Sequence, residues 1–214
     1  MDLVKRFRPW LRAHWGRLLY RVSEEHAVEG IVIALYGPLD SERGVLLNKL
    51  HAALELLKTH DQRSLERIRL YAKAIWVHMG VPGYGAWNAS QQLIELQDEY
   101  VMSEETTPPD VASTLVHEAT HAWLTKRGIA YDAGQRARVE AVCYRTELVF
   151  LRRVSGVETE LITQTEAQLD LEESTWRTGA YRSRELDRLT DLGVPKWLRS
   201  TIDWFAKRAR SRAA

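Results

Sequence analysis

The stretch His117-Glu118-Ala119-Thr120-His121 decides how this chain is interpreted. Side chains four residues apart on a helix lie one above the other, so His117 and His121 would reach one metal ion at about 2.0 to 2.1 Å. Glu118 would lie beside that ion as a candidate general base. The alternative is an ordinary solvated helix face, on which these residues need no metal. The flanking sequence must therefore indicate whether the stretch is helical.

The flanking residues predict a helix from about Pro108 to Arg127. Thr107 is a hydroxyl cap, two prolines occupy the first turn, and Asp110 stands three residues after the cap. A basic last turn followed by Gly128 marks the end. Apolar residues recur between these ends at helical spacing: Val111, Leu115, Val116, Ala119, Ala122 and Trp123.

A third metal ligand is needed, because a catalytic zinc has three protein ligands and one position open for water. A second helix is expected to begin near Asp132, with Gln135 completing a reciprocal cap. Glu140 lies early on this helix beside an apolar stripe and is the preferred third ligand. Glu147, seven residues later on the same side, is the rival ligand. A carboxylate beside an apolar stripe must be neutralised, left at the edge or bound to a positive group.

The motif followed by Glu140 on a separate downstream helix resembles the gluzincin-type zinc metallopeptidases. The resemblance covers residues 65 to 155, and only the HExxH motif is specific. It implies an α+β, zincin-like fold, with a small twisted sheet beside the motif helix and the glutamate helix closing the metal site. By this resemblance His117, His121 and Glu140 bind Zn²⁺, and Glu118 is the general base.

Two features depart from related patterns. No histidine follows His121, so the metzincin variant does not fit. Many gluzincins carry an aspartate four residues after the ligand glutamate, as a partner for a histidine, and here that position is Tyr144. The partner of the histidine is therefore unassigned, and full activity is an open question.

The expected function is zinc-dependent hydrolysis of peptide bonds in protein or peptide substrates, with endopeptidase action preferred. Zinc would lower the pKa of a water molecule towards about 7, and Glu118 would take its proton. Tyr131, Tyr144 and Tyr181 are candidate hydrogen-bond donors to the oxyanion. Two alternatives remain: a weak or inactive protein of the same fold that binds a partner, and a basic helical module for membranes or nucleic acid.

The remaining segments predict one α+β domain. Residues 80–85 are expected to form a loop between two strands. Trp87 and Asn88, which follow directly, are also expected to lie in the loop before the second strand. An exposed strand here could align an extended peptide, with a plain core hairpin as the alternative. The expected strands are 30–36, 70–78 and 92–99, and the further helices are 41–58, 158–176, 183–192 and 195–210.

Length and composition favour a single metallopeptidase-like domain of 214 residues, since no linker, repeat or low-complexity tract divides it. We expect a basic amphipathic helix over residues 1–25, a zincin-like core over 30–155 and a helical tail over 156–214. Cys143 is the only cysteine, so a reducing compartment fits, and it would lie near the metal or in the core. No signal peptide or membrane span is visible, so a cytoplasmic location is expected.

The two ends of the chain are basic. Residues 1–21 and 196–214 each carry six basic side chains and one acidic side chain, and both contain tryptophans, although the net charge is +1. Such ends could contact an anionic membrane surface, or fold back on the acidic middle of the chain, with nucleic acid a less favoured partner. They could equally pack their aromatic rings into the core and leave the charges in water.

Overall fold

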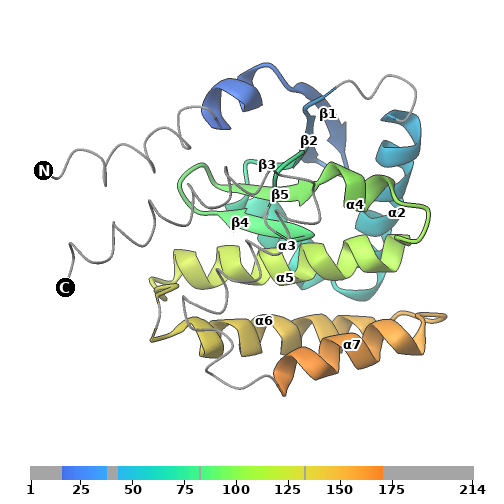
Figure 1. Cartoon of the computed structure of the whole chain (residues 1–214), viewed down its shortest axis with the longest axis vertical. Coiled ribbons are helices and arrows are strands. Elements are labelled where there is room, and N and C mark those ends of the chain that lie inside the picture. Colours follow the sequence, from blue (N-terminus) through green and yellow to red (C-terminus); the bar gives the residue numbers. More distant parts are fainter. Residues whose placement is uncertain (1–15, 38–42, 82, 133, 171–214) are drawn as a thin grey trace, which may run out of the picture. The chain divides into compact units, whose positions relative to one another are not determined.

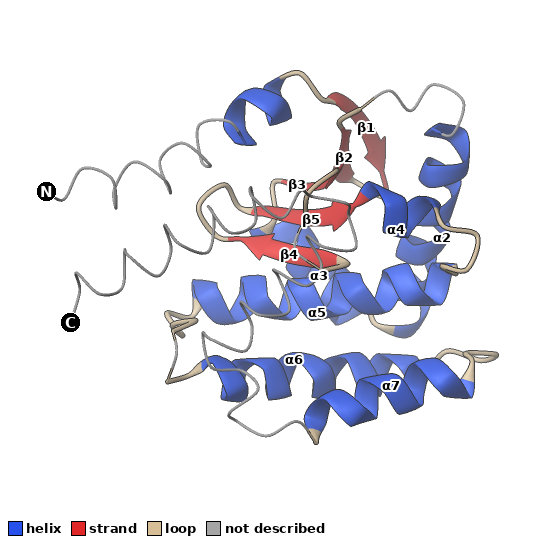
Figure 2. Ribbon diagram, in the orientation of Figure 1, coloured by secondary structure: helices blue, strands red, loops and turns tan. Residues whose placement is uncertain are grey.

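The structure is a computed structural model that describes residues 16–37, 43–81, 83–132 and 134–170, all within one compact unit, Ala13–Leu171. These residues form an α+β fold with a small mixed sheet and several helices (Figures 1 and 2). In chain order the elements are β1 (Glu24–Val28), β2 (Ile31–Leu35), α2 (Arg43–His60), α3 (Gln62–Tyr71), β3 (Ala74–His78), β4 (Gly85–Asn88), β5 (Leu93–Gln97), α4 (Asp98–Met102), α5 (Pro108–Lys126), α6 (Arg136–Leu151) and α7 (Thr159–Leu169).

The sheet has the strand order β1-β2-β3-β5-β4. Its central strands β2, β3 and β5 run parallel, and β1 and β4 pair antiparallel at the two edges. Every residue of β3 and β5 is buried, including the polar residues His78, Glu95 and Gln97. The edge strand β4 pairs with β5 through Gly85 opposite Leu96 and Trp87 opposite Ile94.

Helix α5 occupies the centre of the molecule, between the sheet and α6, and α7 packs on α6 (Figure 1). The main core lies where α2, α3 and α5 meet one face of the sheet, and it includes Leu50, Ile75 and Val116. The other face of the sheet carries Trp76, on which Leu19 and Tyr20 pack. Because α5 is covered on both sides, its polar side chains must find partners inside the protein.

The structure confirms several of the predicted elements. Helix α5 begins after Thr107, as expected, and Asp110 Oδ2 accepts a hydrogen bond from the Thr107 N–H at 2.7 Å. The predicted strands 30–36 and 92–99 contain β2 and β5, and the predicted helix 41–58 overlaps α2. Helix α6 begins at Arg136, four residues after the expected start, because Asp132 first forms a turn by accepting from the N–H groups of Gly134 and Gln135.

Other predictions were wrong. Leu70 and Tyr71 end α3 rather than begin a strand, since the mostly apolar segment 70–78 spans the end of a helix, the connecting residues Ala72 and Lys73, and β3. Residues 85–88 form β4 rather than a loop, and β3 and β5 are parallel neighbours rather than a hairpin. Residues 16–21 are helical but β1 begins at Glu24, so the predicted helix over residues 1–25 is too long.

The remaining predictions for the two ends concern residues that the structure does not describe. These are residues 1–15, the end of the predicted helix 158–176, and the predicted helices 183–192 and 195–210. The single domain and its helical tail therefore remain predictions. Among the described helices, none combines the length and the apolar character that crossing a bilayer requires.

We predict that Asp110→Ala lowers the free energy of unfolding by about 1 kcal/mol. The reason is that the Thr107 N–H loses its acceptor, so the capping box at the start of α5 is broken. Urea denaturation followed by circular dichroism measures this loss. The control is Glu104→Ala, which removes an exposed carboxylate just before the helix and should leave the midpoint unchanged. Equal midpoints for Asp110→Ala and the unmodified protein would contradict the assigned cap.

Candidate metal centre

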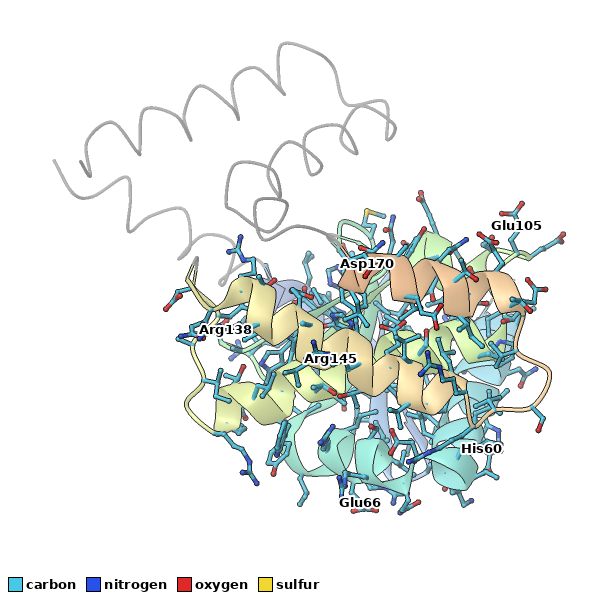
Figure 3. The ribbon with its side chains drawn as sticks, turned by 90° about the horizontal axis from the view of Figure 1, so that it is seen from below. His60, Glu66, Glu105, Arg138, Arg145 and Asp170 are labelled. Carbon is cyan, nitrogen blue, oxygen red and sulfur yellow. The ribbon has the colours of Figure 1, made fainter. Side chains whose placement is uncertain are left out.

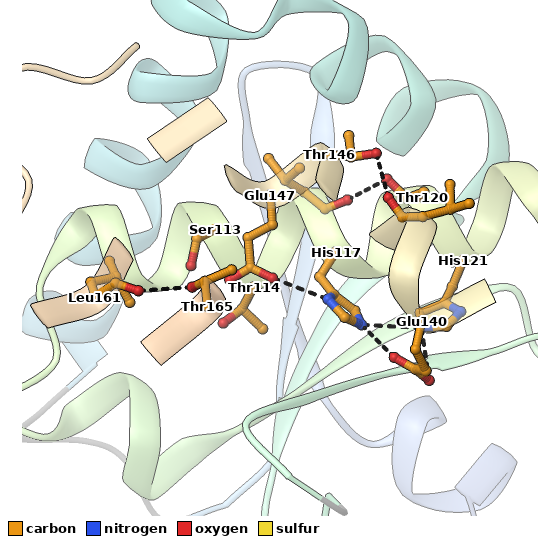
Figure 4. Close-up of polar contacts among 12 residues, drawn as sticks. Ser113, Thr114, His117, Thr120, His121, Glu140, Thr146, Glu147, Leu161 and Thr165 are labelled. Atoms are coloured by element: carbon orange, nitrogen blue, oxygen red, sulfur yellow. Dashed lines mark hydrogen bonds and ion pairs between the residues drawn. The ribbon is translucent and has the colours of Figure 1, made fainter. Parts of the chain in front are cut away.

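Three side chains from two neighbouring helices converge between α5 and α6 (Figure 4). Helix α5 supplies His117 and His121, and α6 supplies Glu140. His117 Nε2 lies 3.2 Å from His121 Nε2 and 3.2 Å from Glu140 Oε2. His121 Nε2 lies 3.6 Å from Glu140 Oε1. The three residues that the sequence indicated as ligands are thus brought together, with their ligand atoms facing one another.

These separations match the spacing of ligands around a tetrahedral ion. Two atoms that each lie 2.0 to 2.1 Å from zinc are roughly 3.3 Å apart when the angle at the ion is tetrahedral. The separations of His117 Nε2 from His121 Nε2 and from Glu140 Oε2, both 3.2 Å, lie close to this value, and the other oxygen of Glu140 lies 3.6 Å from His121 Nε2. The side chains present therefore fit a small divalent cation.

Glu147 lies on the other side of the His117 ring. Its Oε2 atom is 3.1 Å from His117 Nδ1, where the ring N–H donates to the carboxylate. This bond holds a proton on Nδ1, so the other nitrogen, Nε2, is the one that could bind an ion between Glu140 and His121. The geometry therefore distinguishes the two candidate glutamates: Glu140 faces both imidazoles, whereas Glu147 contacts only the far nitrogen of His117. Tyr144 stands where the related pattern has an aspartate that contacts a histidine. Here Glu147 makes such a contact instead.

A cation could take the place of a proton at this centre. When both nitrogens of His117 carry protons, Nδ1 donates to Glu147 and Nε2 donates to Glu140. An ion bound to Nε2 would replace the second proton, and the same carboxylate would then face the ion.

Charge is also unevenly distributed at this centre. Glu118, Glu140 and Glu147 are all buried, with exposures of 6, 5 and 8%. Burial alone would lower the pKa of His117, but hydrogen bonds to Glu140 and Glu147 outweigh it, so the pKa is raised well above its ordinary value. Burial likewise opposes ionisation of Glu140, yet contacts with His117 and His121 lower the pKa of this carboxyl strongly. The buried carboxylates thus favour positive charge on His117.

Glu118 lies on the side of α5 that faces the sheet edge. Burial raises the pKa of its carboxyl, although His121 and His117 act in the opposite direction. The main-chain N–H of Trp87, in β4, donates a hydrogen bond to this carboxylate. The edge strand therefore holds the candidate base next to the imidazole pair, a contact for which the sequence offers no signal.

Gly85 allows β4 to approach α5 this closely. A Cβ atom at this position would lie 2.7 Å from Thr114 Cγ2, 3.2 Å from Leu96 Cδ2 and 3.3 Å from Glu118 Cγ. Any side chain would therefore push the strand away from the helix. Glycine is required here for space.

The candidate oxyanion donors have different surroundings. The Tyr131 hydroxyl donates a short hydrogen bond to Glu140 Oε1, and its ring stands edge-on to His121. The Tyr144 ring stands edge-on to His117, with the ring centroids 4.6 Å apart. Tyr181 lies outside the described residues. Tyr131 and Tyr144 therefore both border the metal centre.

Cys143 is completely buried, and its sulfur lies within 4.8 Å of ligand atoms of His117 and His121. It packs with Leu124 and Val139 in a small apolar cluster. Burial raises the pKa of the thiol far above its ordinary range, and the nearby carboxylates raise it further. Cys143 is therefore both a core residue and a further candidate ligand, since a bound ion would itself favour the thiolate.

A second group of possible ligands lies at the surface and consists of Glu29, His51 and Glu55. Lys58 Nζ is 3.2 Å from Glu29 and 3.0 Å from Glu55, so an ammonium group already balances these carboxylates. The outer face of α6 carries the exposed side chains of Arg138 and Arg145 (Figure 3). Neither feature supplies ligands to the centre between α5 and α6.

Comparisons of the chain with protein-family models, curated proteins and solved structures found no match. Function is therefore inferred from the centre itself.

We predict that Gly85→Ala destabilises the protein by about 1 to 3 kcal/mol, because the added methyl group overlaps Thr114 and forces β4 away from α5. Urea denaturation measures the effect. Gly44→Ala is the matched control, since no heavy atom lies within 4 Å of its Cβ position and alanine favours the α2 helix. If Gly85→Ala were as stable as Gly44→Ala, the close approach of β4 would be wrong.

Proposed function

We propose that this chain is a zinc-dependent peptidase whose ion is held by His117, His121 and Glu140. The observation that carries the proposal is the convergence of their ligand atoms at separations of 3.2, 3.2 and 3.6 Å. The contact between Glu147 and His117 adds support, because histidine ligands commonly donate their other N–H to a carboxylate. The resemblance of the motif to gluzincin-type metallopeptidases, with a sheet on one side of α5 and a glutamate helix on the other, is consistent with a zincin-like arrangement.

The chemistry is divided between the ion and the chain. A zinc ion in this position would act as a Lewis acid and lower the pKa of a water molecule towards about 7. Glu118 is the residue that accepts the proton, because it is adjacent to His117 and the Trp87 N–H orients its carboxylate. One carboxylate oxygen can accept the Trp87 N–H while the other remains available for the proton. The same residue would return the proton to the leaving amine.

A peptide is the proposed substrate because of the resemblance of the motif to gluzincin-type metallopeptidases. Tyr84 O accepts from Gln97 N at 3.1 Å, so the main-chain groups of Tyr84, Ala86 and Asn88 face β5. By alternation, those of Gly85 and Trp87 face away from β5, towards α5 and Glu118. This part of the edge is therefore already covered by α5, and the preference for endopeptidase action rests on the resemblance alone.

The alternative is a protein of the same fold that binds a partner without catalysis. Its support came from Tyr144, which stands where a gluzincin would carry an aspartate as the partner of a histidine. Glu147 makes a contact of this kind with His117 Nδ1 at 3.1 Å, so this reason for doubting catalysis is weaker. Binding to membranes or nucleic acid concerns the basic ends outside the described residues, and the cytoplasmic location stays a prediction.

We predict that the purified protein binds one zinc ion per chain and that His121→Ala and Glu140→Gln lose it, because each removes a ligand. Glu147→Gln should keep the same stoichiometry with an affinity lowered about 10- to 100-fold, since it disturbs only the orientation of His117. Elemental analysis after dialysis and competition with a chelating dye measure both quantities. His51→Ala, at the exposed surface group, is the control. Equal zinc affinity in His121→Ala and the unmodified protein would exclude the proposed ligands.

We predict that Glu118→Gln retains zinc but cleaves peptides about 10²- to 10⁴-fold more slowly, because the amide cannot accept the proton. Cleavage of a mixed peptide library, read by mass spectrometry with a chelator-treated sample beside it, measures the loss. Glu105→Gln, an exposed carboxylate before α5, is the control. Cleavage by Glu118→Gln at the unmodified rate would refute the role of Glu118.

A further inference from the structure

We propose that Tyr131 is a positioning residue that keeps Glu140 bound to the ion through a single oxygen. This role rests on the proposed function, because it requires an ion between His117, His121 and Glu140. The Tyr131 hydroxyl donates its proton to Glu140 Oε1, and the other oxygen of that carboxylate lies 3.2 Å from His117 Nε2. The two oxygens of Glu140 therefore have different partners.

The carboxylate is placed where it could bind an ion through both oxygens. Oε2 faces His117 at 3.2 Å and Oε1 faces His121 at 3.6 Å, so both oxygens border the same position. Binding through both would add a fourth protein donor and occupy the position that a catalytic zinc leaves open for water. Because Oε1 accepts the hydrogen bond from Tyr131, this oxygen is a weaker donor to a metal ion than Oε2. Tyr131 thus favours binding through Oε2 alone.

Two contacts of its ring position Tyr131, which is 44% exposed. The ring stands at 86° to His121, with the centroids 5.2 Å apart, and the guanidinium of Arg136 lies 5.0 Å from the ring centroid. Tyr131 therefore contacts two of the three proposed ligands, from the connection between α5 and α6. Because its hydroxyl proton is committed to Glu140, it is a weaker candidate for oxyanion donor than the sequence suggested.

Cobalt(II) is the probe that tests this role, because the visible absorption of a four-coordinate cobalt site is several times stronger than that of a five-coordinate site. We expect cobalt in the unmodified protein to give the strong, four-coordinate spectrum. Tyr131→Phe keeps the ring but loses the hydroxyl, so its spectrum should weaken towards that of five-coordinate cobalt. Its zinc affinity should also change, by up to about 10- to 100-fold, as expected for partners of a ligand.

The matched control is Tyr20→Phe, which removes a similar tyrosine–glutamate hydrogen bond, from Tyr20 to Glu25 Oε1 at 3.1 Å, on the other face of the sheet. It should leave the cobalt spectrum unchanged. Arg136→Ala is the second variant, since losing the guanidinium above the ring should shift the spectrum in the same direction by a smaller amount. Circular dichroism establishes that each variant is folded.

The outcomes separate the two proposals. If the unmodified protein takes up no cobalt, both the peptidase proposal and the role of Tyr131 fail. If it gives a four-coordinate spectrum that Tyr131→Phe and Arg136→Ala leave unchanged, the zinc site stands and only the role of Tyr131 is overturned. A weakened spectrum in Tyr131→Phe, with Tyr20→Phe unchanged, supports the role.

Discussion

The interaction on which the site depends is the double contact of His117 with two glutamates of α6. Glu147 binds Nδ1 at 3.1 Å and Glu140 faces Nε2 at 3.2 Å, so one imidazole ring is held from both sides. Both carboxylates are buried, and a buried carboxylate is costly unless a positive or hydrogen-bonding group accompanies it. The pair of helices therefore satisfies its buried charges only when α5 and α6 lie in this register. The same register directs Nε2 of His117 to the position where a cation fits.

The rest of the fold supports α5 in this position. The sheet and α3 cover α5 on one side and α6 on the other, so the helix has little freedom to rotate and carry its histidines away. Ala119 and Ala122 are fully buried along the helix, where small side chains let neighbouring elements approach. Gly85 does the same for the edge strand, which brings the Trp87 N–H to Glu118. The centre is thus built from rigid elements, which favours a fixed arrangement of ligands.

The sequence predicted those features that depend on residues close to one another along the chain. Thr107 and Asp110 marked the start of α5, and the four-residue spacing of His117 and His121 placed both rings on one side of that helix. Glu140 followed from its place beside an apolar stripe. Contacts between distant segments were not predictable in this way: β4 is a four-residue strand containing Gly85 and Asn88, and only its pairing with β5 makes it a strand. Glu147 was assigned the right helix face, but which side of the His117 ring it meets depends on how α6 packs on α5.

The most direct test of the central claim is a crystal structure of the zinc-loaded protein with anomalous scattering measured on both sides of the zinc edge. The account predicts one strong peak at about 2.0 to 2.1 Å from His117 Nε2, His121 Nε2 and one oxygen of Glu140. Glu147 should remain on Nδ1 of His117, away from the ion. A fully occupied zinc bound elsewhere, with no peak between α5 and α6, would contradict the account.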